Sequence, residues 1–109
     1  MDFPTLLRDV QRRPGAYGLD GSYREFVAFI NGCNAIADRS PLDGFREWLA
    51  ERLGLGANLV WWELVRRIHG SEHEASPADE DVARTMFALL YEFAAHREGR
   101  GHRPRPDAS

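Results

Sequence analysis

The chain has 109 residues, of which 43% are hydrophobic and 28% are charged. This composition is typical of one soluble globular domain, and it excludes a fibrous or a disordered protein. The formal net charge is −3, and no stretch approaches the roughly 20 apolar residues of a membrane-spanning helix. We therefore expect neither a membrane protein nor a specific nucleic-acid binder, which would need a basic surface to contact phosphates.

Cysteine usage and the amino terminus predict a cytoplasmic protein. The lone Cys33 cannot form an internal disulfide, and acidic Asp2, followed by Pro4 and Arg8, does not resemble the start of a signal peptide. Helical spacing places Cys33 among apolar residues with no base nearby, so we expect a buried, unreactive thiol. No cofactor and no catalytic residue are predicted, and the chain is not expected to be an enzyme.

The amino-terminal part is predicted to form two helices. The first covers residues 3–13 and ends at Pro14-Gly15, a pair that is typical of turns. The second begins at the capping box Ser22-Tyr23-Arg24-Glu25. In such a box the Ser22 hydroxyl accepts a hydrogen bond from the third helical amide, and the Glu25 carboxylate accepts one from the Ser22 amide.

Three more helix starts follow along the chain. Ser40-Pro41-Leu42-Asp43 and Ser76-Pro77-Ala78-Asp79 share one pattern, in which a serine cap precedes a proline at the first helical position. Asn58 is the predicted cap of the helix between them. The predicted breaks between helices fall at residues 14–21, 38–41, 54–57 and 70–77.

Apolar residues recur at helical spacing within the predicted helices. The stripes are Phe26, Val27, Ile30, Cys33 and Ala37; Phe45, Trp48, Leu49 and Leu53; Trp61, Leu64, Val65 and Ile68; and Val82, Met86, Leu89, Leu90 and Phe93. Short connections between amphipathic helices are typical of compact bundles. We therefore predict an all-α fold, a compact bundle of about five short helices over residues 1–97. Residues 98–109, rich in Arg, Pro and Gly, are predicted to form a flexible, disordered tail.

The string His69-Gly70-Ser71-Glu72-His73 matches the H-x-x-E-H pattern of a class of zinc metallopeptidases. In those enzymes two histidines one helical turn apart bind the metal, and the acid activates water. The glycine and serine inside this string predict a helix end and a loop, so a catalytic zinc site is not expected. His69, Glu72 and His73 are the candidate ligands of the alternative hypothesis, a small metal- or ligand-binding helical protein.

The adjacent residues Trp61 and Trp62 lie about 100° apart on a helix, so both cannot occupy the centre of one apolar stripe. Trp61 aligns with the stripe, which makes Trp62 a candidate anchor for a partner protein, because exposed tryptophan often dominates interface energies. In the structural alternative, Trp62 packs beneath the preceding loop.

The stretch from residue 72 to residue 81 holds five acids and no basic residue. The acids are Glu72, Glu74, Asp79, Glu80 and Asp81. Such a patch steers a basic partner toward the protein. In the structural alternative, the amino terminus of a helix favours acids and accounts by itself for those at 79–81.

Three segments occur in the order R-P-G-x-Y, F-[IL]-x-G and F-x-x-W-[LV]: Arg13 to Tyr17, Phe26 to Gly32, and Gly44 to Leu49. In this order the chain resembles a loose group of small, mostly uncharacterised bacterial proteins over about residues 8–69. Some members look like immunity or accessory proteins encoded near polymorphic toxins. Ala16 stands where many relatives have methionine, and the resemblance implies no site residues.

We predict a non-enzymatic protein-interaction module, of the immunity type, that masks a basic protein partner. The predicted partner-binding residues are Trp62, Glu72, Glu74, Asp79, Glu80 and Asp81, with the acids steering the partner and the tryptophan filling a pocket. Besides the metal- or ligand-binding alternative, a structural homodimer is the other class of function left open.

Overall fold

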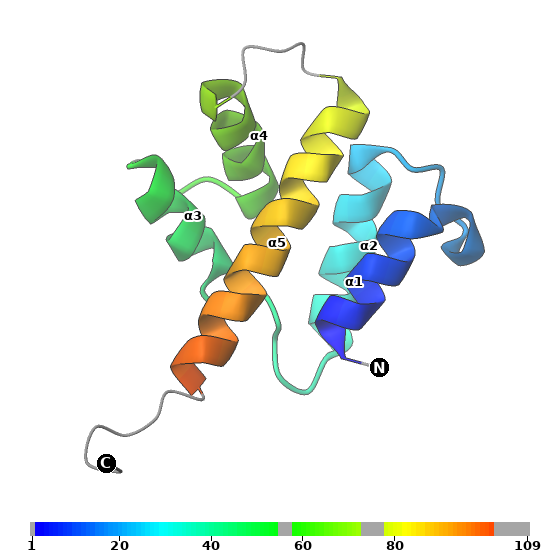
Figure 1. The fold of residues 1–109 in the computed structure, drawn as a ribbon, viewed down its shortest axis with the longest axis horizontal. Coiled ribbons are helices and arrows are strands. Elements are labelled where there is room, and N and C mark those ends of the chain that lie inside the picture. Colours follow the sequence, from blue (N-terminus) through cyan, green and yellow to red (C-terminus); the bar gives the residue numbers. More distant parts are fainter. Residues whose placement is uncertain (1, 55–57, 73–77, 102–109) are drawn as a thin grey trace.

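The structure is a computed structural model that describes residues 2–54, 58–72 and 78–101, with only the backbone for Glu72 and residues 99–101 (Figure 1). The described elements are α1 (Phe3–Arg12), the single 3-10 turn η1 (Pro14–Tyr17), α2 (Tyr23–Ile36), α3 (Phe45–Leu53), α4 (Trp61–Glu72) and α5 (Asp79–Gly101). The predicted all-α bundle of five helices is confirmed. No helix in these ranges is long and apolar enough to cross a membrane.

The longest helix, α5, runs through the middle of the bundle. In Figure 1, α1 and α2 lie on one side of it, and α3 and α4 lie on the other. The predicted apolar stripe of α5 is buried, and Ala83 and Phe87 widen it. Because α5 meets helices on both sides, a wider apolar surface than a single stripe is needed to cover it.

Aromatic rings join α3, α4 and α5 at the core. Phe45 is fully buried, and its ring centroid lies 5.1 Å from that of Phe93 and 5.6 Å from that of Trp61. On the other side of α5, Phe26 and Phe87 meet edge to face at 4.9 Å. The tilted and edge-on geometries are those that aromatic pairs prefer.

One of the two hydrogen bonds of the predicted capping box forms at the start of α2, and the other does not. The Ser22 hydroxyl accepts from the Glu25 amide at 3.3 Å, as predicted. The Glu25 carboxylate instead accepts from the Asp20 amide at 2.7 Å, while the Ser22 amide donates to Asp20. Gly21 has φ +85°, and the turn that it allows brings the Asp20 side chain to the amide of Ser22.

The start of α3 corrects the prediction of a serine cap at Ser40. Residues 41–44 form turns, and the helix begins at Phe45 after Gly44, whose φ is +86°. Leu42 is buried, and its amide donates to the Asn34 side chain at 3.0 Å. Contact with α2 therefore fixes this segment in place of a local cap.

The boundaries of α4 also differ from the prediction. The carbonyl of Val60 accepts from the amides of Glu63 and Leu64, so the helix starts two residues later than a cap at Asn58 implies. The helix continues through Gly70 and Ser71 to Glu72, where a break was expected. The Ser71 hydroxyl donates to the Ile68 carbonyl, a bond that keeps this polar side chain within the last turn.

The predicted cap of α5 at Ser76 and Pro77 lies outside the described residues. The helix itself begins at Asp79, with the Ala78 carbonyl accepting from the amides of Asp81 and Val82. It extends to Gly101, beyond the domain boundary predicted at residue 97. The rest of the predicted tail, residues 102–109, is outside the described ranges.

Candidate functional site

The described part of the acidic run is used largely within the fold. The Asp79 carboxylate accepts a hydrogen bond from the Tyr23 amide at 2.5 Å, and Asp81 forms an ion pair with Arg84 at 2.9 Å. Glu80 is exposed. The side chain of Glu72 and all of Glu74 lie outside the described residues. For Asp79 and Asp81, this placement supports the structural alternative, in which the amino terminus of the helix itself favours acids.

Trp62 is half-buried and packs on the core, where its ring meets that of Trp61 edge to face at 5.4 Å. Its backbone carbonyl accepts from the Tyr23 hydroxyl at 2.7 Å. Tyr23 thus contacts two predicted site residues, Trp62 through its hydroxyl and Asp79 through its amide. Tyr23 is itself buried, and this burial raises the pKa of its phenol.

His69 of the H-x-x-E-H string is a core residue. It is 4% exposed, and its Nδ1 lies 2.7 Å from the Thr85 hydroxyl of α5. His73 and the side chain of Glu72 fall outside the described residues. Among the residues that the structure does describe, no group of three or more His, Cys, Asp or Glu side chains could hold a metal ion.

Cys33 was predicted to be buried, but it is partly exposed on α2. Partial burial disfavours the charged thiolate, and it therefore raises the pKa of the Cys33 thiol above the ordinary value for cysteine. Because the thiolate is the reactive form, the raised pKa agrees with the predicted low reactivity.

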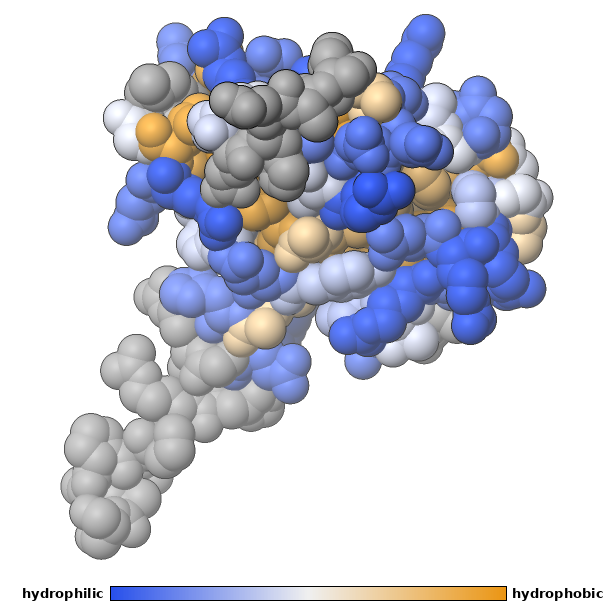
Figure 2. All heavy atoms as spheres, turned by 45° about the horizontal axis from the view of Figure 1, so that its top comes forward, coloured by the Kyte–Doolittle hydropathy of each residue, from blue (hydrophilic) through white to orange (hydrophobic). Residues whose placement is uncertain are grey.

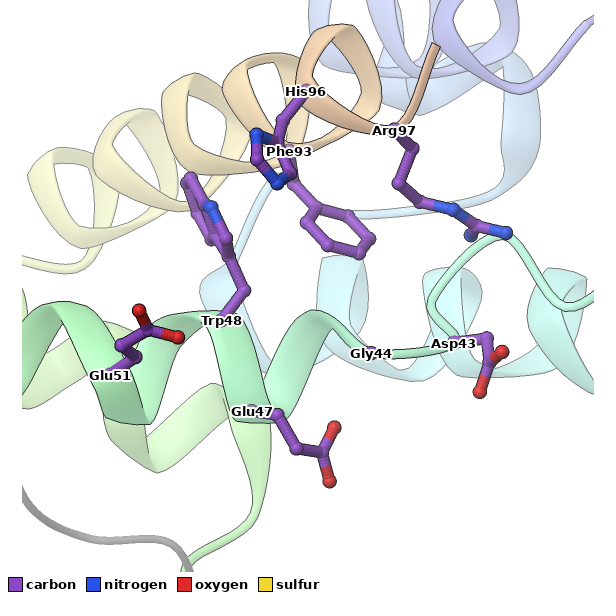
Figure 3. Close-up of a pocket in the computed structure, with 8 residues that line it drawn as sticks. All are labelled: Asp43, Gly44, Glu47, Trp48, Glu51, Phe93, His96 and Arg97. Atoms are coloured by element: carbon purple, nitrogen blue, oxygen red, sulfur yellow. The ribbon is translucent and has the colours of Figure 1, made fainter. Parts of the chain in front are cut away.

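A groove of about 460 Å³ lies between α3 and the second half of α5 (Figure 3). Its lining combines acids, aromatic rings and two basic side chains: Asp43, Gly44, Glu47, Trp48, Glu51, Phe93, His96 and Arg97. Figure 3 shows the α3 side chains on one wall and those of α5 on the other. We call this feature the α3–α5 groove.

Three exposed carboxylates follow one wall of the α3–α5 groove. Asp43, Glu47 and Glu51 are spaced four residues apart, which places Glu47 and Glu51 one above the other on α3. Glu47 accepts from its own backbone amide and pairs with Arg46 at 3.0 Å; these two contacts lower the pKa of its carboxyl. The Glu47 carboxylate therefore keeps its negative charge at neutral pH, within an ion pair with Arg46.

Aromatic rings form the floor of the α3–α5 groove. The half-buried Trp48 ring stacks on buried Phe45, and its centroid lies 5.5 Å from that of Phe93. The His96 ring is 6.3 Å from Trp48, and Figure 3 shows it above the indole. The Phe93 ring lies next to Gly44 at this end, where a Cβ would be in ordinary contact with it at 3.8 Å. Packing from behind holds the indole in a fixed position.

Two arginines next to the α3–α5 groove, Arg97 and Arg52, are held by oxygen atoms of the protein. Arg97 donates to the carbonyls of Ser40 at 3.0 Å and Pro41 at 2.7 Å, and its guanidinium lies over Phe93. Arg52 pairs with Glu92 at 2.5 Å and lies over Trp48. These contacts direct the Arg97 guanidinium to the backbone of residues 40 and 41 and the Arg52 guanidinium to Glu92.

Sequence reasoning did not find the α3–α5 groove. It placed Trp48 in the core stripe of α3, and it used Asp43 only as an acid near a helix start. The four-residue spacing of Asp43, Glu47 and Glu51 was the available signal, but nothing local indicated that Phe93 would complete the floor.

Hydrophilic residues cover most of the face shown in Figure 2, with hydrophobic atoms visible between them. Among the described residues, only Ile36 and Val60 are large hydrophobic side chains that are exposed. The described surface therefore has no broad apolar patch, and the α3–α5 groove combines polar and aromatic side chains instead.

No protein-family model, no curated protein and no solved structure matches the chain. The resemblance to small immunity-like proteins stays a prediction.

Proposed function

We propose that this protein is an interaction module that binds a basic segment of a partner protein in the α3–α5 groove. The observation that carries the proposal is the line of three exposed carboxylates beside the fixed rings of Trp48 and Phe93. The proposal keeps the predicted basic partner but moves its binding site from Trp62 and the acids of residues 72–81 to the groove between α3 and α5.

Charge supports the choice of a basic partner. Asp43, Glu47 and Glu51 form a row of one sign, and such rows attract oppositely charged partners and suppress partners of the same charge. Arg97, the arginine that lines the groove, already donates to backbone carbonyls. Arg46 already pairs with Glu47, so an incoming cation shares that carboxylate and also meets Asp43 and Glu51.

The aromatic floor supports binding through arginine or lysine in particular. These side chains combine a charged head with an apolar stem, and the stem packs on rings while the head contacts carboxylates. The protein's own Arg52 and Arg97 already lie over Trp48 and Phe93, at 5.9 and 5.7 Å, so an incoming cation replaces one of them or packs on the part of the ring that they leave uncovered. An immunity-type protein that masks a basic toxin domain is one form of this function.

Fluorescence anisotropy with a labelled, alanine-based helical peptide tests the proposal. The peptide carries arginine pairs four residues apart, and a second peptide carries glutamate at the same positions. Each exposed ion pair contributes about 0.2–1 kcal/mol, so E47Q/E51Q should weaken arginine-peptide binding by between about twofold and thirtyfold. The glutamate peptide should not bind.

A matched control removes two acids outside the groove lining. Asp38 and Glu98 are exposed, so D38N/E98Q changes the net charge by the same amount. This variant should bind the arginine peptide as the unmodified protein does. Equal loss of affinity in both double variants would show only a general charge effect, and would overturn the proposed site.

A further inference from the structure

Helix α1 carries an exposed pair of arginines with the same spacing as the glutamates of the α3–α5 groove. Arg8 and Arg12 are four residues apart on α1 and both are exposed, the side chain of Arg12 by 78%. Together with Thr5 and Arg13 they line a shallow depression of about 500 Å³. We call this feature the α1 arginine surface.

The acid in the middle of the α1 arginine surface is engaged within its own chain. Asp9 accepts two hydrogen bonds from Arg13 and one from the Tyr17 hydroxyl at 2.6 Å. Arg12 is 3.5 Å from the same carboxylate, and Arg8 lies over the ring of Tyr91. The surface thus holds three guanidinium groups and one carboxylate, which contacts two of them, and it keeps a positive charge.

The two surfaces are complementary in charge and in spacing. Side chains four residues apart lie one helical turn apart on both helices, so two guanidinium groups of α1 can stand opposite Glu47 and Glu51 of α3. We infer that the α3–α5 groove of one copy receives the α1 arginine surface of a second copy. This inference rests on the proposed function, because it names a partner for the same groove.

The positions of the two surfaces determine the kind of assembly. Figure 1 shows α1 and α3 on opposite sides of α5. One contact between two copies therefore leaves a free α1 on one copy and a free groove on the other, which is a head-to-tail arrangement. Assembly should continue beyond two copies as the protein concentration rises, whereas the structural homodimer, one of the sequence-based alternatives, stops at two.

Sedimentation velocity of the full chain tests the inference through two charge-reversed variants. The unmodified protein should increase in mean mass with concentration at low ionic strength and return to monomer at high salt, because exposed pairs are screened. E47R/E51R and R8E/R12E should each associate at least about tenfold more weakly.

A mixture of the two variants should associate again, because the α1 of E47R/E51R and the groove of R8E/R12E are both intact. The arginines introduced in the groove and the glutamates introduced in α1 are also complementary in charge, so the mixture can grow beyond one copy of each variant. R24E/R39E, which reverses two exposed arginines elsewhere, is the matched control and should assemble as the unmodified protein does. Circular dichroism checks that each variant is folded, and R8Q/R12Q replaces R8E/R12E if that variant is not.

Failure of this inference is distinguishable from failure of the proposed function. A protein that stays monomeric, or a mixture that does not associate, overturns self-assembly while the arginine peptide still binds the groove. Association that survives both charge reversals also overturns it, since another surface then joins the copies. If neither the peptide nor a second copy depends on Glu47 and Glu51, the proposed function fails as well.

Discussion

The Tyr23 amide donates a 2.5 Å hydrogen bond to the carboxylate of Asp79, a residue 56 positions further along the chain. Asp79 is the first residue of α5, and Tyr23 is the first residue of α2. The carboxylate therefore lies at the amino termini of two helices, where the free amides favour negative charge. An acid that the sequence places in a binding patch joins two elements of the fold.

Replacing Asp79 should lower stability, whereas replacing its neighbour should not. Asp79→Ala removes the acceptor for a helix-terminal amide, and we expect the free energy of unfolding to fall by about 1 kcal/mol. Glu80→Ala, at an exposed position in the same turn, should change it by less than about 0.5 kcal/mol. Urea denaturation followed by circular dichroism measures both. Equal effects would contradict the role given to Asp79.

Trp61 and Asn31 should be coupled energetically through their hydrogen bond. The Trp61 indole is 7% exposed and donates to the Asn31 side chain at 2.9 Å. Asn31→Ala leaves this buried donor without its acceptor, and should destabilise the protein by about 1–3 kcal/mol. In a double-mutant cycle with Trp61→Phe, the coupling energy should be about 1 kcal/mol. Additive effects would show that the bond contributes nothing.

Two glycine substitutions should change the free energy of unfolding in opposite directions. Gly44→Ala places a side chain at φ +86°, which should cost about 1–2 kcal/mol although its Cβ would lie 3.8 Å from Phe93. Gly32→Ala lies inside α2 with no atom within 4 Å of the new Cβ, and should stabilise the protein by about 0.5–1 kcal/mol. Thermal melts of the two variants measure the difference, and a stabilising Gly44→Ala would contradict the backbone assignment.

Asp9 should make stability depend on pH in the acid range. Its hydrogen bonds from Arg13 and Tyr17 lower the pKa of this carboxyl well below the ordinary value. A lowered folded-state pKa stabilises the protein above the unfolded-state pKa of about 4, and this contribution is lost as pH falls further.

The comparison with Asp9→Asn isolates this contribution. The unmodified protein should have the higher urea midpoint at pH 7, and the difference between the two proteins should shrink steadily below about pH 4. A difference that stays constant from neutral to acid pH would show that the charge of Asp9 contributes no stability.

Local sequence signals predicted the helices well. The Ser22 cap and the stripe through Trp61, Leu64 and Val65 depend only on residues within a few turns, so the sequence shows them directly. The start of α3 was missed because Asn34 holds the Leu42 amide from another helix. The helix-start preferences of Ser40 and Pro41 contain no information about that contact with α2.

The candidate site was harder to predict than the fold for the same reason. Glu47 and Phe93 line one groove but belong to two different helices, and nothing in the sequence predicts that these helices pack together. The acids at 79–81 gave a stronger local signal, and the structure uses Asp79 to bind a backbone amide. A dense run of charge at a helix start can therefore have a role in the fold itself, as Asp79 does.

Binding of a basic segment beside Trp48 is tested most directly by proton–nitrogen NMR of the indole groups. The chain has three tryptophans, which single Trp→Phe variants assign. On titration with the arginine peptide, the Trp48 indole signal should move, while that of Trp61, which is bonded to Asn31 in the core, should stay. If the Trp62 signal moves and the Trp48 signal does not, the partner binds near Trp62 of α4, one of the residues predicted from the sequence, and the α3–α5 groove is not the site.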